Sequence, residues 1–188
     1  MNFMDTARDF VSGLPEALQG LGVFLVSFIP WVEGEGAALI GVLVGVSPWL
    51  AIPVAVVGNV LVVAALVYAV GGTREAVLRR RRSAVAAGVG PVDADLRDDV
   101  APPAADARMR ERFERWGVPG VSMLGPWVFL PGHVAGPAMV GLGATKGYVM
   151  LWQVVSIVVY TVLTGLLAAG LIGWAARAGV EASLPGAF

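Results

Sequence analysis

Residues 28–46, FIPWVEGEGAALIGVLVGV, place two carboxylates inside an otherwise apolar stretch and decide how the chain is interpreted. Glu33 and Glu35 are flanked only by glycine and apolar residues. An ionised carboxylate near the centre of a bilayer costs at least about 2.5–3.5 kcal/mol, so such a group persists mainly where a proton, a cation or a substrate compensates it. The two acids therefore mark either a site within a membrane or an exposed loop between membrane helices.

The composition of the whole chain indicates lipid as its surroundings. Of the 188 residues, 57% are apolar and 14% are charged, whereas a soluble domain is about half apolar and about a quarter charged. The chain has no cysteine and one histidine, which excludes thiolate chemistry and argues against a metal site. No nucleophile and base can be paired from the sequence, so we expect neither an enzyme nor a cofactor.

The chain divides into two apolar blocks around one polar linker, which predicts an all-α integral membrane protein. Each block is expected to end in one transmembrane helix, at residues 49–72 and 147–176. Both stretches are uncharged and long enough to cross the hydrocarbon layer of about 30 Å. The predicted segments are an interfacial amphipathic helix at 1–13, a first block at 14–72, a linker at 73–116, a second block at 117–176 and a tail at 177–188.

The first part of each block, at residues 14–47 and 117–146, is interrupted by proline and glycine. Such breakers prevent one clean spanning helix, and non-helical backbone at membrane depth needs burial in protein or a water-filled cavity. We therefore predict a re-entrant helical hairpin in each block, in which two short helices enter and return to the same side. The predicted breakers are Pro30, Gly34, Gly36, Pro131 and Gly132.

The two blocks also resemble each other. Residues 41–49, GVLVGVSPW, and residues 139–148, MVGLGATKGY, each lead from a hairpin into a long apolar helix. Each block is then a hairpin followed by a span, and the single span reverses the direction of the second copy. Inverted repeats of this kind are typical of secondary transporters, whose sites lie near the midplane where broken helices meet.

The basic linker sets the expected orientation. Short loops rich in arginine stay in the cytoplasm, so the 73–116 linker is predicted to be cytoplasmic and the protein to lie in a bacterial-type inner membrane. Nucleic-acid binding is not expected, because the same linker carries many acids. Four consecutive arginines are interpreted as topology determinants that also contact lipid headgroups, namely Arg79, Arg80, Arg81 and Arg82.

Four residues are candidates for proton or substrate binding. Glu33 and Glu35 repel each other at this spacing, which raises the pKa of at least one of them toward neutrality. His133 lies in the corresponding part of the second block, and it either pairs with a glutamate, contacts an anionic headgroup or bonds a backbone carbonyl. Asn59 lies mid-span and is expected to form an interhelical hydrogen bond, including one to the glutamate hairpin. Gln153 and Ser156 are expected to serve packing.

These residues resemble those of the small multidrug export protein family, which is related to the DedA-like (SNARE-associated, VTT) membrane proteins. The matching positions are Pro30, Glu33, Gly36-Ala37, Gly58-Asn59 and Pro131-Gly132. The chain departs from the family at Gly34-Glu35, where a Leu-Arg pair is usual, and at His133, where DedA-like proteins carry arginines. The resemblance implies a dimeric re-entrant-hairpin protein that exports compounds or handles a lipid carrier.

The leading functional hypothesis is a membrane transporter with Glu33 and Glu35 at a midplane site. It would couple protons to export or to flipping of a lipid carrier, act on a lipid carrier or an amphipathic small molecule, and form a homodimer within the lipid bilayer. The alternative hypothesis is a non-transporting membrane scaffold that binds a partner through the 73–116 linker. Deletion of residues 83–107 would separate the two, because only the scaffold needs that segment for its function.

Overall fold

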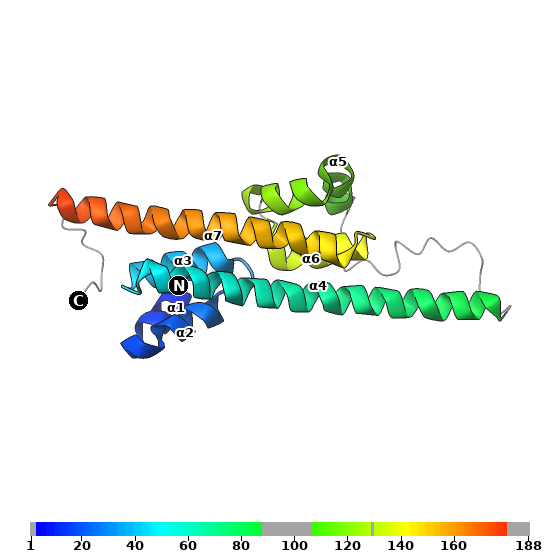
Figure 1. Ribbon diagram of the computed structural model, residues 1–188, viewed down its shortest axis with the longest axis horizontal. Coiled ribbons are helices and arrows are strands. Elements are labelled where there is room, and N and C mark those ends of the chain that lie inside the picture. Colours follow the sequence, from blue (N-terminus) through cyan, green and yellow to red (C-terminus); the bar gives the residue numbers. More distant parts are fainter. Residues whose placement is uncertain (1–2, 88–106, 129, 180–188) are drawn as a thin grey trace. The chain divides into compact units, whose positions relative to one another are not determined.

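The computed structural model describes residues 3–87, 107–128 and 130–179 (Figure 1). Within these residues the chain forms α-helices and one short 3-10 helix, and it forms no strand. Parts of the predicted linker and tail, as well as the first two residues, lie outside the described ranges. The elements are α1 (Phe3–Ser12), α2 (Glu16–Val26), α3 (Glu33–Leu43), α4 (Pro48–Ala86), α5 (Ala107–Leu124), η1 (Gly125–Val128), α6 (Gly132–Gly141) and α7 (Lys146–Arg177).

Two helices, α4 and α7, are long and apolar enough to cross a membrane by length and composition. α7 covers the span predicted at 147–176 with one further residue at each end. α4 begins close to the predicted start but continues past residue 72 to Ala86. The extension forms because residues 73–86 are mostly alanine, arginine, leucine and glutamate, which favour helix, and contain no glycine or proline. The first residues of the linker predicted at 73–116, up to Ala86, therefore belong to α4. Its last residues, from Ala107, belong to α5.

Most of the surface of α4 and α7 is apolar and open. Within the most apolar window of each helix, 33% of the α4 residues and 28% of the α7 residues are buried. The core helix of a soluble domain would have most of these residues buried. Large apolar side chains, among them Leu61, Leu163 and Leu171, are about half exposed or more. Each long helix thus packs along one narrow strip and presents apolar side chains elsewhere.

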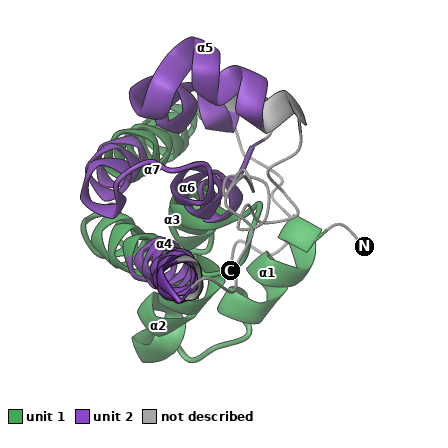
Figure 2. Ribbon diagram, turned by 90° about the vertical axis from the view of Figure 1, so that its right-hand side faces the viewer, with its two compact units in different colours: residues 1–60, 157–188 green, residues 61–156 purple. Residues whose placement is uncertain are grey.

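The chain forms two compact units, coloured separately in Figure 2. The first unit comprises residues 1–60 and 157–188, and the second comprises residues 61–156. The divisions fall inside α4 and α7, so each unit contains one part of each long helix. The first unit also contains α1, α2 and α3, whereas the second also contains α5, η1 and α6.

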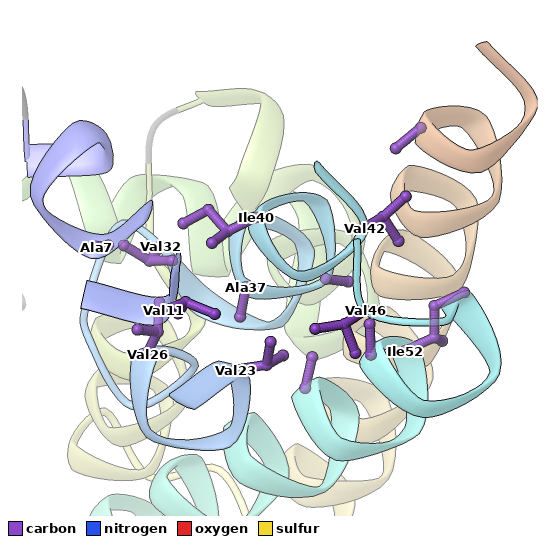
Figure 3. Close-up of a cluster of buried hydrophobic side chains, with 14 residues drawn as sticks. Ala7, Val11, Val23, Val26, Val32, Ala37, Ile40, Val42, Val46 and Ile52 are labelled. Atoms are coloured by element: carbon purple, nitrogen blue, oxygen red, sulfur yellow. The ribbon is translucent and has the colours of Figure 1, made fainter. Parts of the chain in front are cut away.

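The first unit is built around a cluster of small and branched apolar side chains (Figure 3). Val11 of α1, Val23 of α2 and Ala37 of α3 are fully buried in this cluster, and Ala51 and Ile52 join it from the first turns of α4. α3 packs against both α1 and α2. Within residues 14–47, the short helices α2 and α3 therefore pack against each other and are joined by residues 27–32.

The second unit contains a kinked helix, α5, followed by η1 and α6. The kink lies at Gly117, whose φ of 63° is in the left-handed region that glycine adopts without strain. Gln153 and Ser156 of α7 bond to Ser122 of α5, the first to its hydroxyl at 3.2 Å and the second to its carbonyl at 2.8 Å. Both residues are buried, so these bonds hold α5 against α7 within the unit.

The connection from α3 to α4 and the connection from α6 to α7 have the same hydrogen-bond pattern. In the first, the N–H groups of Val44, Gly45 and Val46 donate to the carbonyls of Ile40, Val42 and Gly41. In the second, the N–H groups of Leu142, Gly143 and Ala144 donate to the carbonyls of Ala138, Val140 and Met139. Gly45 and Gly143 both have positive φ, of 96° and 109°. These two loops thus end their short helices in the same way and start the long ones at matching positions.

Candidate functional site

The connection between α2 and α3 places the two glutamates. Its backbone is unusual, because Trp31 and Glu33 have positive φ values of 76° and 51°. Non-glycine residues in this region cost on the order of 1–3 kcal/mol each and persist where the surrounding structure holds them. The Val32 and Glu33 N–H groups both donate to the Ile29 carbonyl at 3.1 Å. The chain therefore turns sharply here and enters α3 with Glu33 as its first residue.

Both acids lie in the first turn of α3, where no side chain caps the helix. The free N–H groups of a helix N-terminus carry partial positive charge, which stabilises carboxylates in the first turn. Glu33 is buried, with 7% of its surface exposed, and Glu35 is half-buried. The helix dipole therefore offsets part of the cost of holding these charges in an apolar unit, and it does so without any basic residue in the helix itself.

Glu35 is the residue of the site whose pKa is clearly raised. It lies in α3, outside the two candidate spanning helices. Burial, and to a smaller extent the neighbouring charge of Glu33, raise the pKa of its carboxyl group from 4.5 to about 7. A carboxyl group with this pKa exchanges its proton near neutral pH, as a proton-coupling group must.

Gly34 lies between the two glutamates, at the point where three helices meet. A Cβ atom at this position would collide with the Thr161 hydroxyl of α7 and would lie 3.3 Å from Asn59 Nδ2 of α4. Asn59 and Thr161 are both completely buried, or nearly so. The structure thus brings Asn59 to the first turn of α3, next to the two glutamates, and it adds Thr161, which the sequence analysis did not identify.

Two oxygen atoms at this meeting point have no hydrogen-bond partner. Asn59 Oδ1 and Thr161 Oγ1 are buried, and neither takes part in a hydrogen bond among the described residues. Buried polar atoms are normally paired, and each exception calls for an explanation. The buried side chains of Asn59 and Thr161 therefore lie beside Gly34, which stands between Glu33 and Glu35 in the sequence, and hydrogen bonding at this place is incomplete.

The glycines of this region act differently from the breakers that the sequence suggests. Gly34 and Gly36 lie inside α3, and the chain breaks before it, over residues 27–32, which include Pro30. The reason is packing: Gly34 lets α4 and α7 approach the helix, and a Cβ at Gly36 would lie 3.0 Å from Val32 Cγ1. The sharp backbone conformations fall on Trp31 and Glu33 instead.

The second unit contains His133 at the corresponding place. Pro131 precedes α6 with φ of −56°, Gly132 is the first residue of the helix, and His133 is the second. His133 is buried, with 5% of its surface exposed. Pro131 therefore ends the preceding loop and Gly132 begins α6, whereas Gly34 is the second residue of α3.

The four arginines lie on the part of α4 that extends beyond the predicted span. Arg79, Arg80 and Arg82 are exposed and Arg81 is half-buried. Lys146, the first residue of α7, has its Nζ 2.7 Å from Glu75 Oε1 and 5.9 Å from the centre of the Tyr68 ring.

Across residues 3–87, 107–128 and 130–179, no group of three or more His, Asp and Glu side chains is placed to hold a metal ion.

Thr161 could have been noticed from helical spacing alone. Gln153, Ile157, Thr161 and Gly165 follow one another at intervals of four, and all four are buried on one face of α7. A polar residue on the same face as Gln153 is thus expected to point into the protein.

Comparisons with protein-family models, with curated proteins and with solved structures found no match to this chain.

Proposed function

We propose that the chain is a multi-pass transporter of a bacterial-type inner membrane, with Glu33 and Glu35 at a proton-coupling site near the midplane. In this proposal α4 and α7 span the bilayer, the segments 14–47 and 117–146 are re-entrant hairpins, and the two halves are inverted repeats. The transporter exports an amphipathic small molecule or flips a lipid carrier, as the resemblance to the small multidrug export and DedA-like proteins suggests. It works as a homodimer, and its linker is cytoplasmic.

One observation carries the proposal. Two glutamates occupy the first turn of a short apolar helix, and one of them is buried in a unit whose other packed residues are mostly apolar. A structural role would be served by one exposed capping acid, and it would not require a second acid beside it. Neighbouring acids in an apolar site, one of them with a pKa raised toward neutrality, are typical of proton-handling centres.

The matching loops support the repeat. The hydrogen bonds that end α3 and α6 pair Gly45 with Gly143, and the same register pairs Pro48, the first residue of α4, with Lys146, the first of α7. Carried back along the short helices, this register pairs Gly34 with Gly132 and Glu35 with His133. One half then carries a carboxyl group at the position where the other half carries an imidazole.

The open apolar surfaces of α4 and α7 support the membrane location and the dimer. In water, such a long exposed apolar surface would associate or aggregate, whereas in a bilayer it faces lipid tails. The few short elements of one chain enclose little space, so a second copy is proposed to complete the translocation pathway. Small residues on the helices allow the close approach that helix association in membranes needs.

Replacing the glutamates tests the transport proposal. We expect Glu33→Gln and Glu35→Gln each to abolish pH-driven transport in proteoliposomes, because glutamine keeps the size of the side chain but cannot carry a proton. A pH-sensitive dye inside the vesicles measures proton movement, with a fluorescent amphipathic cation and a fluorescent polyprenyl phosphate as alternative substrates. Gel filtration of each variant in detergent measures whether the homodimer remains folded.

Glu16→Gln is the matched control for this experiment, because it removes one exposed acid from α2. It should transport at the rate of the unmodified protein. If both glutamine variants at positions 33 and 35 also retain that rate with every probe, the transport proposal is wrong.

Cysteine labelling tests the re-entrant hairpins, because the natural chain has no cysteine. Single cysteines at positions 33, 35 and 133 are expected to react with a membrane-impermeant maleimide, since a re-entrant tip lines a watery cavity. Cysteines that replace Val57 of α4 and Leu163 of α7, both about half exposed, are expected to remain unreactive because they face lipid. Mass spectrometry of labelled membranes measures the extent of reaction from each side.

The pattern of labelling decides between a cavity and a surface loop. Equally fast labelling at Val57, Leu163 and the hairpin positions would mean that all of them face bulk water, which contradicts a bilayer location. If cysteines at positions 33 and 35 react as fast as a cysteine that replaces the exposed Glu16, the segment that carries the two glutamates is an ordinary surface loop.

A further inference from the structure

The Thr161 hydroxyl is withheld from the bond that a helical threonine usually makes. A threonine in a helix commonly bonds the carbonyl one turn earlier. Thr73 of α4 does so, with 3.0 Å between Oγ1 and the Ala69 carbonyl, and Ser83 makes the same kind of bond to Arg79 at 3.1 Å. Thr161 is fully buried, yet its Oγ1 has no hydrogen-bond partner among the described residues. Its hydroxyl is therefore available to a group outside its own helix.

The hydroxyl points to the first turn of α3. The Cβ direction of Gly34 runs into Thr161 Oγ1, and Asn59 Nδ2 and Cβ lie 3.3 and 3.4 Å from the same point. Glu33 and Glu35 flank Gly34 on either side. A glutamate side chain is long and flexible enough to carry its carboxyl group from either flank to this point. Two buried oxygens without partners thus stand within reach of two acids.

The donors and acceptors at this place do not match, because Asn59 Oδ1 lacks a donor. Asn59 Oδ1 can only accept, and an ionised carboxylate can only accept. The Thr161 hydroxyl supplies one donor and Asn59 Nδ2 supplies two. When the Thr161 hydroxyl donates to a carboxylate, Asn59 Oδ1 is left without a donor, whereas a protonated carboxyl group has an O–H to donate to it. Binding one proton therefore gives both buried oxygens a partner.

We propose that Asn59 and Thr161 form a proton-binding site with Glu35, in which the protonated carboxyl group donates to Asn59 Oδ1 and accepts from the Thr161 hydroxyl. The step is the binding of one proton from water to a carboxylate oxygen, and no other covalent bond forms or breaks. Protonation then ties α3 to α4 and α7, and loss of the proton releases it. This inference rests on the proposed function, because it names how the coupling proton is held and which helices respond to it.

The surroundings favour Glu35 as the carrier of the proton. It is half-buried, so that water can reach it, and burial together with the charge of Glu33 raises its pKa to about 7. Ionisable groups on the neighbouring elements are few. They are Glu33 of α3 itself, Asp5, Arg8 and Asp9 of α1, Glu16 of α2, and Tyr160 and Arg177 of α7, with none on the α4 residues of the first unit. Of the groups on α1, only Arg8 is partly buried.

Infrared difference spectroscopy of the purified full chain tests the site without a transport assay. The carbonyl stretch of a protonated carboxyl group is followed as the pH is lowered, and Glu35→Gln identifies the band. Thr161→Val removes the hydroxyl at nearly constant volume, so we expect the stretch to move to higher frequency as a hydrogen bond to the carbonyl oxygen is lost. Thr161→Ser should restore it. Asn59→Leu should lower the titration midpoint by about half to one pH unit, because the acid form loses its acceptor.

Thr164→Val is the matched control, since it makes the same change one turn away on α7, at a half-buried position. It should leave both the band and the midpoint unchanged. Thr161→Ala provides a second hydroxyl-free variant if the valine variant does not fold. An unchanged frequency in the hydroxyl-free variants, or a shift that serine fails to reverse, overturns the proposal.

The result is separable from that of the transport experiment. If Glu35→Gln abolishes transport while the carbonyl stretching frequency is unchanged in the Thr161 variants, the proposed function stands and this inference fails. If the band responds to Thr161 and Asn59 while Glu35→Gln transports normally, the proton site exists but is not coupled to transport.

Discussion

Gly58→Ala is expected to lower the free energy of unfolding by about 2–4 kcal/mol, the largest stability effect of any single methyl group considered for the first unit. Gly58 lies on α4 where the last turn of α2 crosses it. An added Cβ would lie 2.8 Å from the Phe24 carbonyl oxygen and 3.2 Å from the Phe24 ring, and it would collide with the Ser27 hydroxyl. A backbone carbonyl cannot move aside unless the whole turn shifts.

The Ser27 hydroxyl makes the collision harder to relieve. It is fully buried and donates to the Phe24 carbonyl at 2.6 Å. Rotating the hydroxyl away from the new methyl group would break this bond and leave a buried polar atom without a partner, which adds about 1–3 kcal/mol. The Phe24 ring is itself held edge-on against Phe28, with 4.9 Å between the ring centres. The neighbours of Gly58 therefore have little freedom to yield.

Thermal unfolding in detergent, followed by circular dichroism, measures the effect. Gly72→Ala is the control, because Gly72 lies on the same helix and an added Cβ there meets nothing within 4 Å. Alanine favours helix over glycine by about 0.5–1 kcal/mol, so the control should be as stable as the natural protein or more stable. Equal melting temperatures for Gly58→Ala and Gly72→Ala would contradict the close packing of α2 on α4.

The long helices were predictable because length and composition alone decide them. Residues 49–72 and 147–176 are uncharged and continuous, and both lie inside helices long enough to span a bilayer. The end of α4 was not predictable in the same way. The charge of residues 73–86 marks the edge of an apolar span and so predicts a linker, but alanine, leucine, glutamate and arginine also extend a helix.

Some residues of the candidate site were predictable from the sequence, and others were not. Glu33 and Glu35 are conspicuous in an apolar stretch, and Asn59 is conspicuous in a predicted span. Gly34 was interpreted as a breaker, since glycine in sequence signals flexibility; in the structure it lies within α3 and provides space for Thr161 and Asn59. Helical spacing could have placed Thr161 on the buried face of α7, but its role could not be assigned from sequence, because that role comes from the meeting of α3 with α7.

Glu35→Gln is expected to stabilise the protein at pH 8 and to leave its stability unchanged at pH 4. The pKa of Glu35 is raised from 4.5 to about 7 by burial and by the charge of Glu33. Between these two pH values the folded chain holds a proton that the unfolded chain has lost, so stability falls as the pH rises through this window. Above about pH 7 the folded protein carries the full penalty of the ionised group. Glutamine remains neutral at every pH and avoids it.

The size of the effect follows from the shift. A shift of this magnitude corresponds to at most about 3 kcal/mol, and because Glu35 is half-buried, water screens part of it and about 1–2 kcal/mol is expected. Thermal unfolding in detergent at pH 4, 6 and 8 measures the difference between the variant and the natural protein. The difference should be absent at pH 4, intermediate at pH 6 and largest at pH 8.

Glu16→Gln separates the effect of burial from that of charge, because it removes one exposed acid of the same unit. A surface substitution of this kind changes stability by no more than about 0.5 kcal/mol. If Glu35→Gln behaved like this control at pH 8, the carboxyl group would have to be fully hydrated or matched by a cation, and α3 would not be holding a strained charge. A gain in stability confined to high pH means instead that the natural protein keeps an acid where glutamine would be more stable, and this is the sacrifice expected of a residue retained for the proton it binds.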